Sequence, residues 1–252
     1  MLGWSLNLFR VRGIQLAVHA SFFLLLAWAA NDGWTLERWN GLWWNSGTLI
    51  AFFACVVLHE LGHSFTAMHY GIGVRRILLM PIGGMAEFDG IPRQPLREFF
   101  ITIAGPAVNF VLAGLLWGYV RRLPGEFAFY SLDGLLYQLF VGNLAMGCFN
   151  LLPAFPMDGG RILRAALASR FPYLRATRIA ATIGKIVCII GIGVALWLHW
   201  WLGAILFAFI SFAGEAEYRA VRRREIDDAR WREMLARVYG ARPENEPPVL
   251  RN

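Results

Sequence analysis

Residues 52–71 read FFACVVLHELGHSFTAMHYG, and this stretch places ionisable side chains inside a hydrophobic run. It begins like a lipid-facing helix and then contains the pattern H-E-x-x-H at His59, Glu60 and His63. An ionisable residue in a membrane segment costs at least about 2.5–3.5 kcal/mol on insertion scales and is by default functional. Because of this cost, we interpret the stretch as a membrane helix that carries a reactive site. A purely structural His/Glu cluster is the alternative.

The composition of the whole chain is also that of a membrane protein. Of its 252 residues, 57% are hydrophobic and 16% are charged, against about 45–50% and about 25% in soluble domains. The eleven Trp suit the headgroup level of a bilayer. The net charge of +7 is explained by positive loops that orient membrane helices, and no basic stripe with interleaved aromatics indicates a nucleic acid partner. The three cysteines lack CxxC spacing and are interpreted as core residues.

Hydrophobic runs predict an all-α polytopic membrane protein, since a crossing takes about 20 apolar residues. Six spans are predicted, at residues 14–30, 47–70, 99–120, 132–152, 179–198 and 200–214. With six spans, most arginines fall on one side of the membrane, and only Arg38, Arg121 and Arg122 fall on the other. The positive-inside rule then predicts that both termini are cytoplasmic.

Two segments depart from the pattern of spans. Residues 75–90, RRILLMPIGGMAEFDG, have two short apolar runs around Pro81 and two glycines, which predicts a short membrane-associated β-hairpin near the active site. An ordinary cytoplasmic loop is the alternative. From residue 215 onward the chain is charged and helix-prone and then ends in Pro-rich sequence. We expect a membrane core of residues 1–218 and a cytoplasmic helical tail, residues 219–252, with a disordered end; a partner-binding helix is the alternative for the tail.

The two histidines of the pattern can bind one metal ion, because residues four apart on a helix lie on one face. Glu60 lies about 100° round the helix from His59 and can reach a metal-bound water without being a ligand. Zn²⁺ lowers the pKa of such a water to about 7. The Glu60 carboxylate can then take a proton during attack and return one to the leaving amine.

A third metal ligand has to come from elsewhere in the chain, because catalytic zinc usually takes three protein ligands. Asp158 is the strongest candidate, since two prolines end an apolar helix just before it and two glycines follow it. Glu87 and Asp89, after the predicted hairpin, are also possible. His19, in the first predicted span, is a weaker candidate and is more consistent with a packed histidine.

These motifs together resemble the site-2 protease family of intramembrane zinc metalloproteases. HELGH lies on a hydrophobic helix, and NLLPAFPMDGG follows about ninety residues later. The residues that match the family's second motif are Asn150, Pro153, Pro156, Asp158 and Gly159. Further similar stretches are GIQLAVHASF, PIGGMAEF and AGPAVNF, and the similarity covers about residues 10–215.

By position, the resemblance implies that His59, His63 and Asp158 bind one Zn²⁺ and that Glu60 is the general base and acid. Some members of the family carry a PDZ insertion or C-terminal nucleotide-binding modules. We expect this chain to be a minimal form without either, and we expect its regulation to differ from that of those members.

Substrate-binding residues are expected near the same site. The resemblance implies that Asn150 contacts the substrate, and Asn109 in AGPAVNF is expected to support it. An unwound substrate segment could pair with the hairpin of residues 77–88 by strand addition, so Gly83 and Gly84 are also predicted to contact the substrate.

The predicted function is intramembrane zinc endopeptidase, acting on peptide bonds in or near transmembrane segments. The resemblance suggests regulated intramembrane proteolysis of a membrane-tethered transcription regulator or its inhibitor. Arg in place of Lys and the compact architecture favour a bacterial inner-membrane protein, and an archaeal origin is the alternative. A membrane zinc transporter is the alternative. It is disfavoured because neither motif recurs, whereas transporters often have repeated halves. A catalytically inactive scaffold that binds membrane helices is a third possibility.

Overall fold

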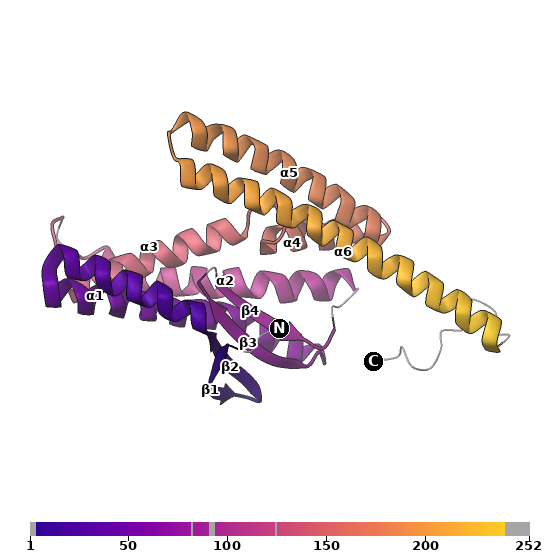
Figure 1. The fold of residues 1–252 in the computed structure, drawn as a ribbon, viewed down its shortest axis with the longest axis horizontal. Coiled ribbons are helices and arrows are strands. Elements are labelled where there is room, and N and C mark those ends of the chain that lie inside the picture. The colour runs from indigo at the N-terminus through magenta and orange to yellow at the C-terminus, as the bar shows by residue number, and fades with distance from the viewer. Residues whose placement is uncertain (1–3, 82, 91–93, 124, 240–252) are drawn as a thin grey trace.

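The computed structural model describes residues 4–81, 83–90, 94–123 and 125–239. The chain is mostly helical, and the helices lie roughly along one direction beside a small sheet (Figure 1). The elements, in chain order, are β1 (Ser5–Val11), β2 (Ile14–His19), α1 (Ala20–His69), β3 (Val74–Met80), β4 (Gly83–Phe88), α2 (Pro95–Val120), α3 (Leu132–Asn150), α4 (Asp158–Ala168), α5 (Tyr173–Trp197) and α6 (Trp201–Tyr239).

The sheet is larger than the hairpin predicted from the sequence. Its strand order is β1-β2-β3-β4, with β2 and β3 parallel and the two outer pairs antiparallel. The predicted hairpin is present as β3 and β4, in which Met80 pairs with Gly83. β4 is therefore an edge strand of the described sheet, and its outer backbone groups have no strand partner there.

The prediction that the first span begins at Ile14 was wrong, because residues 14–19 form β2. Ile14 and Leu16 are fully buried in this central strand. A strand buried on both faces is a near-continuous apolar run, and periodicity cannot distinguish such a run from the start of a buried helix.

Helix α1 contains two antiparallel arms and accounts for the first two predicted spans. Glu37 and Arg38 have non-helical backbone angles, and the chain reverses direction there. The Phe22 and Phe53 rings from opposite arms lie 4.7 Å apart. Gly33 and Gly41 lie at the bend, where a Cβ on either would overlap the backbone of the other. The region between the predicted spans is thus mostly helix.

Four described helices are long and apolar enough to cross a membrane, namely α1, α2, α3 and α5. The count of six spans is not established and stays a prediction. Helix α6 runs without a break through the boundary predicted between residues 218 and 219. The tail is predicted to have a disordered end, and its last residues, 240–252, lie outside the described residues. The division into a core and a tail also stays a prediction.

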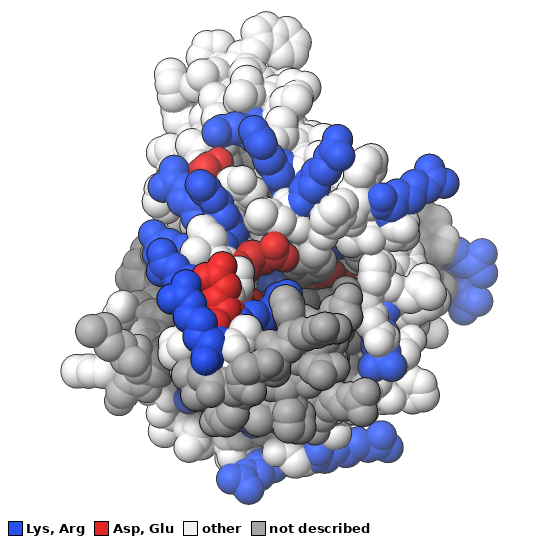
Figure 2. Space-filling view, turned by 90° about the vertical axis from the view of Figure 1, so that its right-hand side faces the viewer, with Lys and Arg blue, Asp and Glu red and all other residues white. Residues whose placement is uncertain are grey.

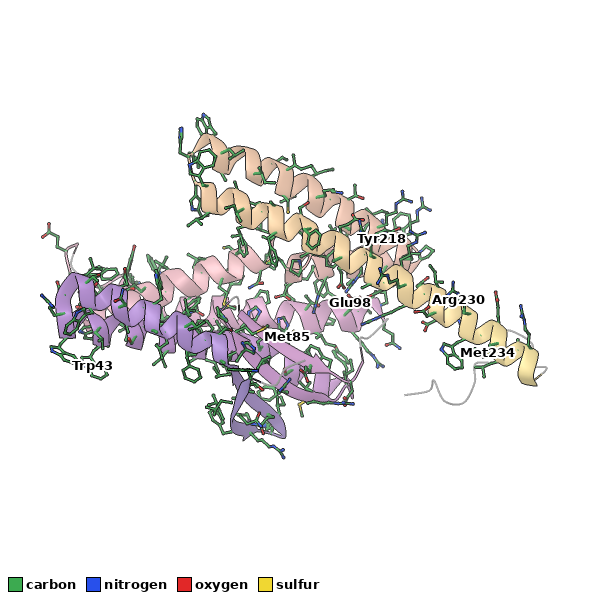
Figure 3. All side chains as sticks on the ribbon, in the orientation of Figure 1. Trp43, Met85, Glu98, Tyr218, Arg230 and Met234 are labelled. Atoms are coloured by element: carbon green, nitrogen blue, oxygen red, sulfur yellow. The ribbon has the colours of Figure 1, made fainter. Side chains whose placement is uncertain are left out.

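Basic side chains gather at one end of the long axis of the molecule (Figure 2). Trp43 lies at one end, whereas Arg230 and Met234 of α6 lie at the other (Figure 3). Seen from the second end, Lys and Arg side chains surround a smaller acidic group (Figure 2). This distribution is the one expected of helices that cross a bilayer with one basic side.

Candidate functional site

The second arm of α1 brings His59 and His63 to face one another inside the helix bundle. Their Nε2 atoms lie 3.1 Å apart, and both residues are buried. Asp158 is the first residue of α4, and its Oδ2 lies 3.3 Å from each Nε2. Residues almost one hundred positions apart therefore place three ligand atoms within 4.8 Å of one another.

Hydrogen bonds behind the rings fix which nitrogen of each histidine faces the centre. Nδ1 of His59 lies 2.5 Å from Oδ1 of Asn109, and Nδ1 of His63 lies 2.8 Å from the carbonyl oxygen of Ile101. A carbonyl oxygen only accepts, so each Nδ1 carries the proton and donates. In the neutral imidazoles, the form that binds metals, both Nε2 atoms are then unprotonated and direct lone pairs at a common point.

The amide of Asn109 is itself oriented by a buried chain of hydrogen bonds. Its Nδ2 donates to Oδ1 of Asn143 at 2.9 Å, and Nδ2 of Asn143 donates to the carbonyl oxygen of Leu139 at 2.8 Å. Since the chain ends on a backbone carbonyl, the oxygen of Asn109 must face His59. Asn109 and Asn143 are both fully buried. The chain fixes the ring of His59, as outer partners do in metal sites.

A metal ion fits the donor set. Two imidazole lone pairs cannot hydrogen-bond to each other, and Oδ2 of Asp158 is buried with no hydrogen-bond partner in the described structure. A cation among the three atoms would satisfy all of them. Two imidazole nitrogens and one carboxylate oxygen suit Zn²⁺, which takes three protein ligands in catalytic sites and keeps a fourth position open.

Small residues allow other elements to approach this centre closely. A Cβ on Gly105 of α2 would overlap Nε2 of His63 and lie 2.8 Å from Cε1 of His59. A Cβ on Gly84 of β4 would lie 3.0 Å from Oε1 of Glu60 and closer still to its Cγ. Helix α2 therefore covers the metal-facing nitrogens, and the edge strand lies directly against Glu60.

A buried ion-pair cluster holds α4, which carries Asp158. Nε of Arg164 donates to Oε1 of Glu98 on α2 at 2.8 Å, and its Nη1 donates to Oε1 of Glu217 on α6 at 3.1 Å. Burial acts to lower the pKa of Arg164, but Glu98, Tyr173 and Glu217 together outweigh burial and raise that pKa. Glu98, labelled in Figure 3, lies on α2 and forms an ion pair with Arg164 of α4. The cluster joins three helices beside the metal site.

The other candidate ligands lie elsewhere. Glu87 pairs with Arg76 at 2.8 Å, and Asp89 pairs with Arg75. The ring of His19 accepts a hydrogen bond from the backbone of Ser21 and caps α1. The metal group found among the described residues is therefore the one with Asp158.

The predicted substrate-binding residues occupy different places. Asn150 is the last residue of α3, and its Nδ2 donates to the carbonyl oxygen of Met146 at 3.0 Å. Gly83 begins β4 with a φ of +133° beside Gly84. Asn109 accepts a hydrogen bond from His59 and so lies behind a predicted metal ligand. Contact between any of these residues and a substrate stays a prediction.

Sequence reasoning missed Gly105 and Asn143. Asn143 could have been found, because an Asn in an apolar span needs an internal hydrogen-bond partner. The role of Gly105 depends on how α2 packs against α1, and no sequence pattern gives that distance.

Comparisons with known proteins agree with this geometry. The family described as Peptidase family M50 matches residues 47–125 and 118–191. A zinc metalloprotease of Methanocaldococcus jannaschii is 40% identical over 222 residues, which are 87% of this chain and 62% of that protein. Stage IV sporulation protein FB of Bacillus subtilis is 29% identical over 222 residues, 84% of this chain and 71% of the relative.

The fold is also similar to a solved structure, a site-2 protease from Methanocaldococcus jannaschii. The TM-score is 0.63 and the identity 38%, with 85% of this chain and 95% of that chain covered. This chain spans less than two thirds of the curated zinc metalloprotease from the same organism.

Proposed function

The chain belongs to peptidase family M50, and on that premise we propose that it is an intramembrane zinc endopeptidase, which hydrolyses peptide bonds in or near membrane-spanning segments of other proteins. One observation supports the proposal most strongly. Three buried ligand atoms from α1 and α4 lie close together and form no hydrogen bond that would satisfy them, and Glu60 is the residue next to the ligand His59. A peptidase needs such a centre together with a base. His59, His63 and Glu60 lie on α1, one of the helices long and apolar enough to cross a membrane.

His59, His63 and Asp158 would hold the zinc ion, which supplies a Lewis acid for the substrate carbonyl and lowers the pKa of water to about 7. Glu60 takes a proton from the attacking water as the new carbon–oxygen bond forms. It returns a proton to the amide nitrogen as the carbon–nitrogen bond breaks, which releases an amine and a carboxylate. Asn109 and the Ile101 carbonyl hold both imidazoles with their Nε2 atoms towards the centre throughout.

We further propose that β4 docks the substrate as an added strand. It is the edge of the described sheet, and its Gly84 lies against Glu60. A helix unwound at the cleavage site exposes backbone groups that an edge strand can pair. Because consecutive N–H groups of a strand point to opposite sides, either Met85→Pro or Ala86→Pro removes a donor on the free edge. If both variants retained zinc and full cleavage, strand addition at β4 would be excluded.

The arrangement in the membrane completes the proposal. We propose six spans with both termini in the cytoplasm, since the basic end of the molecule is the end that the positive-inside rule assigns to that side (Figure 2). Asn150 would contact the substrate backbone where α3 ends. The substrate class would be membrane-tethered transcription regulators or their inhibitors, cleaved in a bacterial inner membrane.

The test compares the purified chain with its Glu60→Gln variant, which keeps the shape of the side chain and removes its basicity. Zinc content should be equal in the two proteins, and cleavage of a model transmembrane substrate should fall by about 10²–10⁴-fold in the variant. Full cleavage by the variant would exclude Glu60 as the base. Zinc flux into reconstituted vesicles without any proteolysis would instead identify a transporter.

A further inference from the structure

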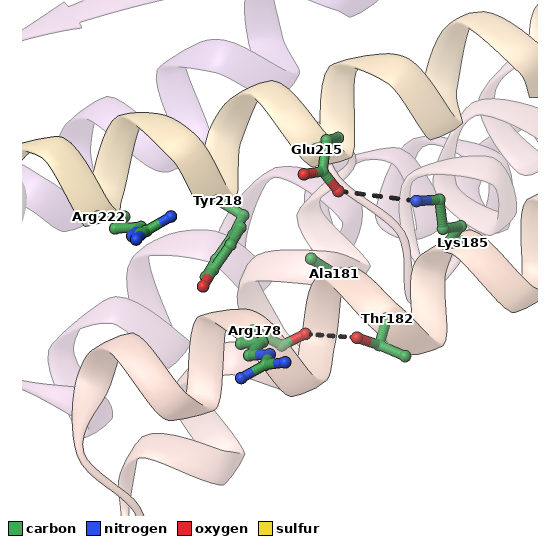
Figure 4. A pocket seen from close by; sticks show the side chains of 7 residues that line it. All are labelled: Arg178, Ala181, Thr182, Lys185, Glu215, Tyr218 and Arg222. Atoms are coloured by element: carbon green, nitrogen blue, oxygen red, sulfur yellow. Dashed lines mark hydrogen bonds and ion pairs between the residues drawn. The ribbon is translucent and has the colours of Figure 1, made fainter.

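A polar pocket of about 470 Å³ lies between α5 and α6, separate from the metal site. It is lined by Arg178, Ala181, Thr182 and Lys185 of α5 and by Glu215, Tyr218 and Arg222 of α6 (Figure 4). Arg178, Tyr218 and Arg222 lie at one end of the pocket, and Lys185 and Glu215 lie at the other (Figure 4). None of these residues has a part in the proposed hydrolysis.

The pocket has an excess of positive charge that its own carboxylate does not neutralise. Glu215 is paired on both oxygens, with Lys185 at 3.7 Å and with Arg219 at 3.3 Å. Within the part of the chain that the structure describes, the guanidinium groups of Arg178 and Arg222 form no ion pair. The guanidinium donors of Arg178 and Arg222 therefore lie at the same end of the pocket and could bind an anion there.

The depth of this end in a bilayer follows from helix lengths. Trp197 and Trp201 mark the far end of the α5–α6 hairpin, and Trp residues collect at the headgroup level. At 1.5 Å per residue, Arg178 lies about 28 Å from Trp197, and Arg222 lies about 32 Å from Trp201. The hydrocarbon core is about 30 Å thick, so both guanidinium groups reach the opposite headgroup level.

Apolar surface continues from the pocket towards the middle of both helices. Ile186 and Ile189 of α5 and Phe212 of α6 are all more than half exposed. A soluble phosphate ion would leave this surface unused, whereas acyl chains would cover it. Basic pockets between membrane helices on the cytoplasmic side bind the headgroups of anionic lipids.

We propose that this pocket binds the phosphate group of an anionic phospholipid. Arg178 and Arg222 donate to the phosphate oxygens from opposite helices, and the Tyr218 hydroxyl donates from between them. The bound lipid would then join α5 to α6. Since Glu217 of α6 also reaches Arg164, the lipid would steady the helix that contacts α4 from behind.

The experiment titrates the delipidated full chain in detergent with dioctanoyl phosphatidylglycerol and follows the bound lipid by native mass spectrometry. The double variant Arg178→Gln/Arg222→Gln should bind about 30-fold more weakly, since each arginine near an anionic lipid strengthens binding by about fivefold and the two effects multiply. A matched control, Arg175→Gln/Arg223→Gln, makes the same change of charge on the same helices outside the pocket and should bind like the parent. Tyr218→Phe should weaken binding by about fivefold.

Parallel titrations with dioctanoyl phosphatidylcholine and with inorganic phosphate identify the ligand. Weak binding of both probes by the parent chain supports an anionic phospholipid. Equal affinity for phosphatidylcholine would overturn the role of charge, and equal affinity for inorganic phosphate would identify a soluble anion instead of a lipid. Equal losses in the control and pocket variants would show a general surface effect and also overturn the proposal.

Discussion

Replacing Gly105 by Ala tests whether the packing of α2 against α1 sets the metal site. The new Cβ would overlap Nε2 of His63 and lie 2.8 Å from Cε1 of His59, where carbon atoms normally keep about 3.5–4.0 Å apart. The rings would have to retreat by about 1 Å. They cannot retreat freely, because Asn109 and the Ile101 carbonyl hold them from behind.

The expected loss of zinc affinity can be estimated from the packing and the hydrogen bonds that the movement of the two rings disturbs. Overpacking a buried site costs about 1–3 kcal/mol, and each strained hydrogen bond adds about 1 kcal/mol at most. A loss of about 2–3 kcal/mol in the metal-bound state weakens zinc binding by about 30- to 150-fold, because each 1.36 kcal/mol is a factor of ten. Zinc affinity is measured by competition with a chelator, and cleavage is measured in parallel.

Gly114→Ala is the matched control on the same helix. A Cβ at Gly114 would have no atom within 4 Å, so zinc affinity should not change. Helix stability should stay the same or rise by up to about 1 kcal/mol, since Ala favours helix over Gly. A folded Gly105→Ala protein with the zinc affinity and cleavage rate of the parent would show that the packing of α2 does not set the metal site.

Three other substitutions test separate parts of the site. Asn143→Leu breaks the buried amide chain, and zinc affinity measured by chelator competition should fall by about 10–100-fold; an unchanged affinity would exclude a role in ring orientation. Arg164→Met leaves Glu98 buried without its partner and should lower the free energy of unfolding by about 3–5 kcal/mol, whereas the double variant with Glu98→Leu should recover most of it in the same unfolding assay. Gly84→Val displaces the Glu60 side chain, so the cleavage rate should fall by about 10²-fold with zinc content unchanged; lost zinc would contradict that separation.

The parts of the site that could be predicted are those fixed by local geometry or by an unusual residue. His59 and His63 share a helix face at any tertiary arrangement, and Asp158 is conspicuous between prolines and glycines after an apolar helix. That the three meet is a property of the fold, which packs α2 against both α1 and α4.

The parts that could not be predicted depend on partners distant in sequence. Residues 14–19 are apolar whether they form a central strand or begin a span, and only pairing with β3 decides between them. The reversal of α1 at Arg38 needs a positive φ in a non-glycine residue, which no turn signal announces. Gly105 likewise acquires its importance from the two rings that it faces.

X-ray absorption spectroscopy of the purified, zinc-loaded chain identifies the atoms that bind the metal. We expect one zinc per chain with only nitrogen and oxygen neighbours at about 2.0–2.2 Å and with the outer scattering of two imidazoles. Asp158→Ala should retain the imidazole signal while zinc binds more weakly. A sulfur neighbour, a single imidazole, or a spectrum and affinity unaffected by Asp158→Ala would exclude His59, His63 and Asp158 as the zinc ligands.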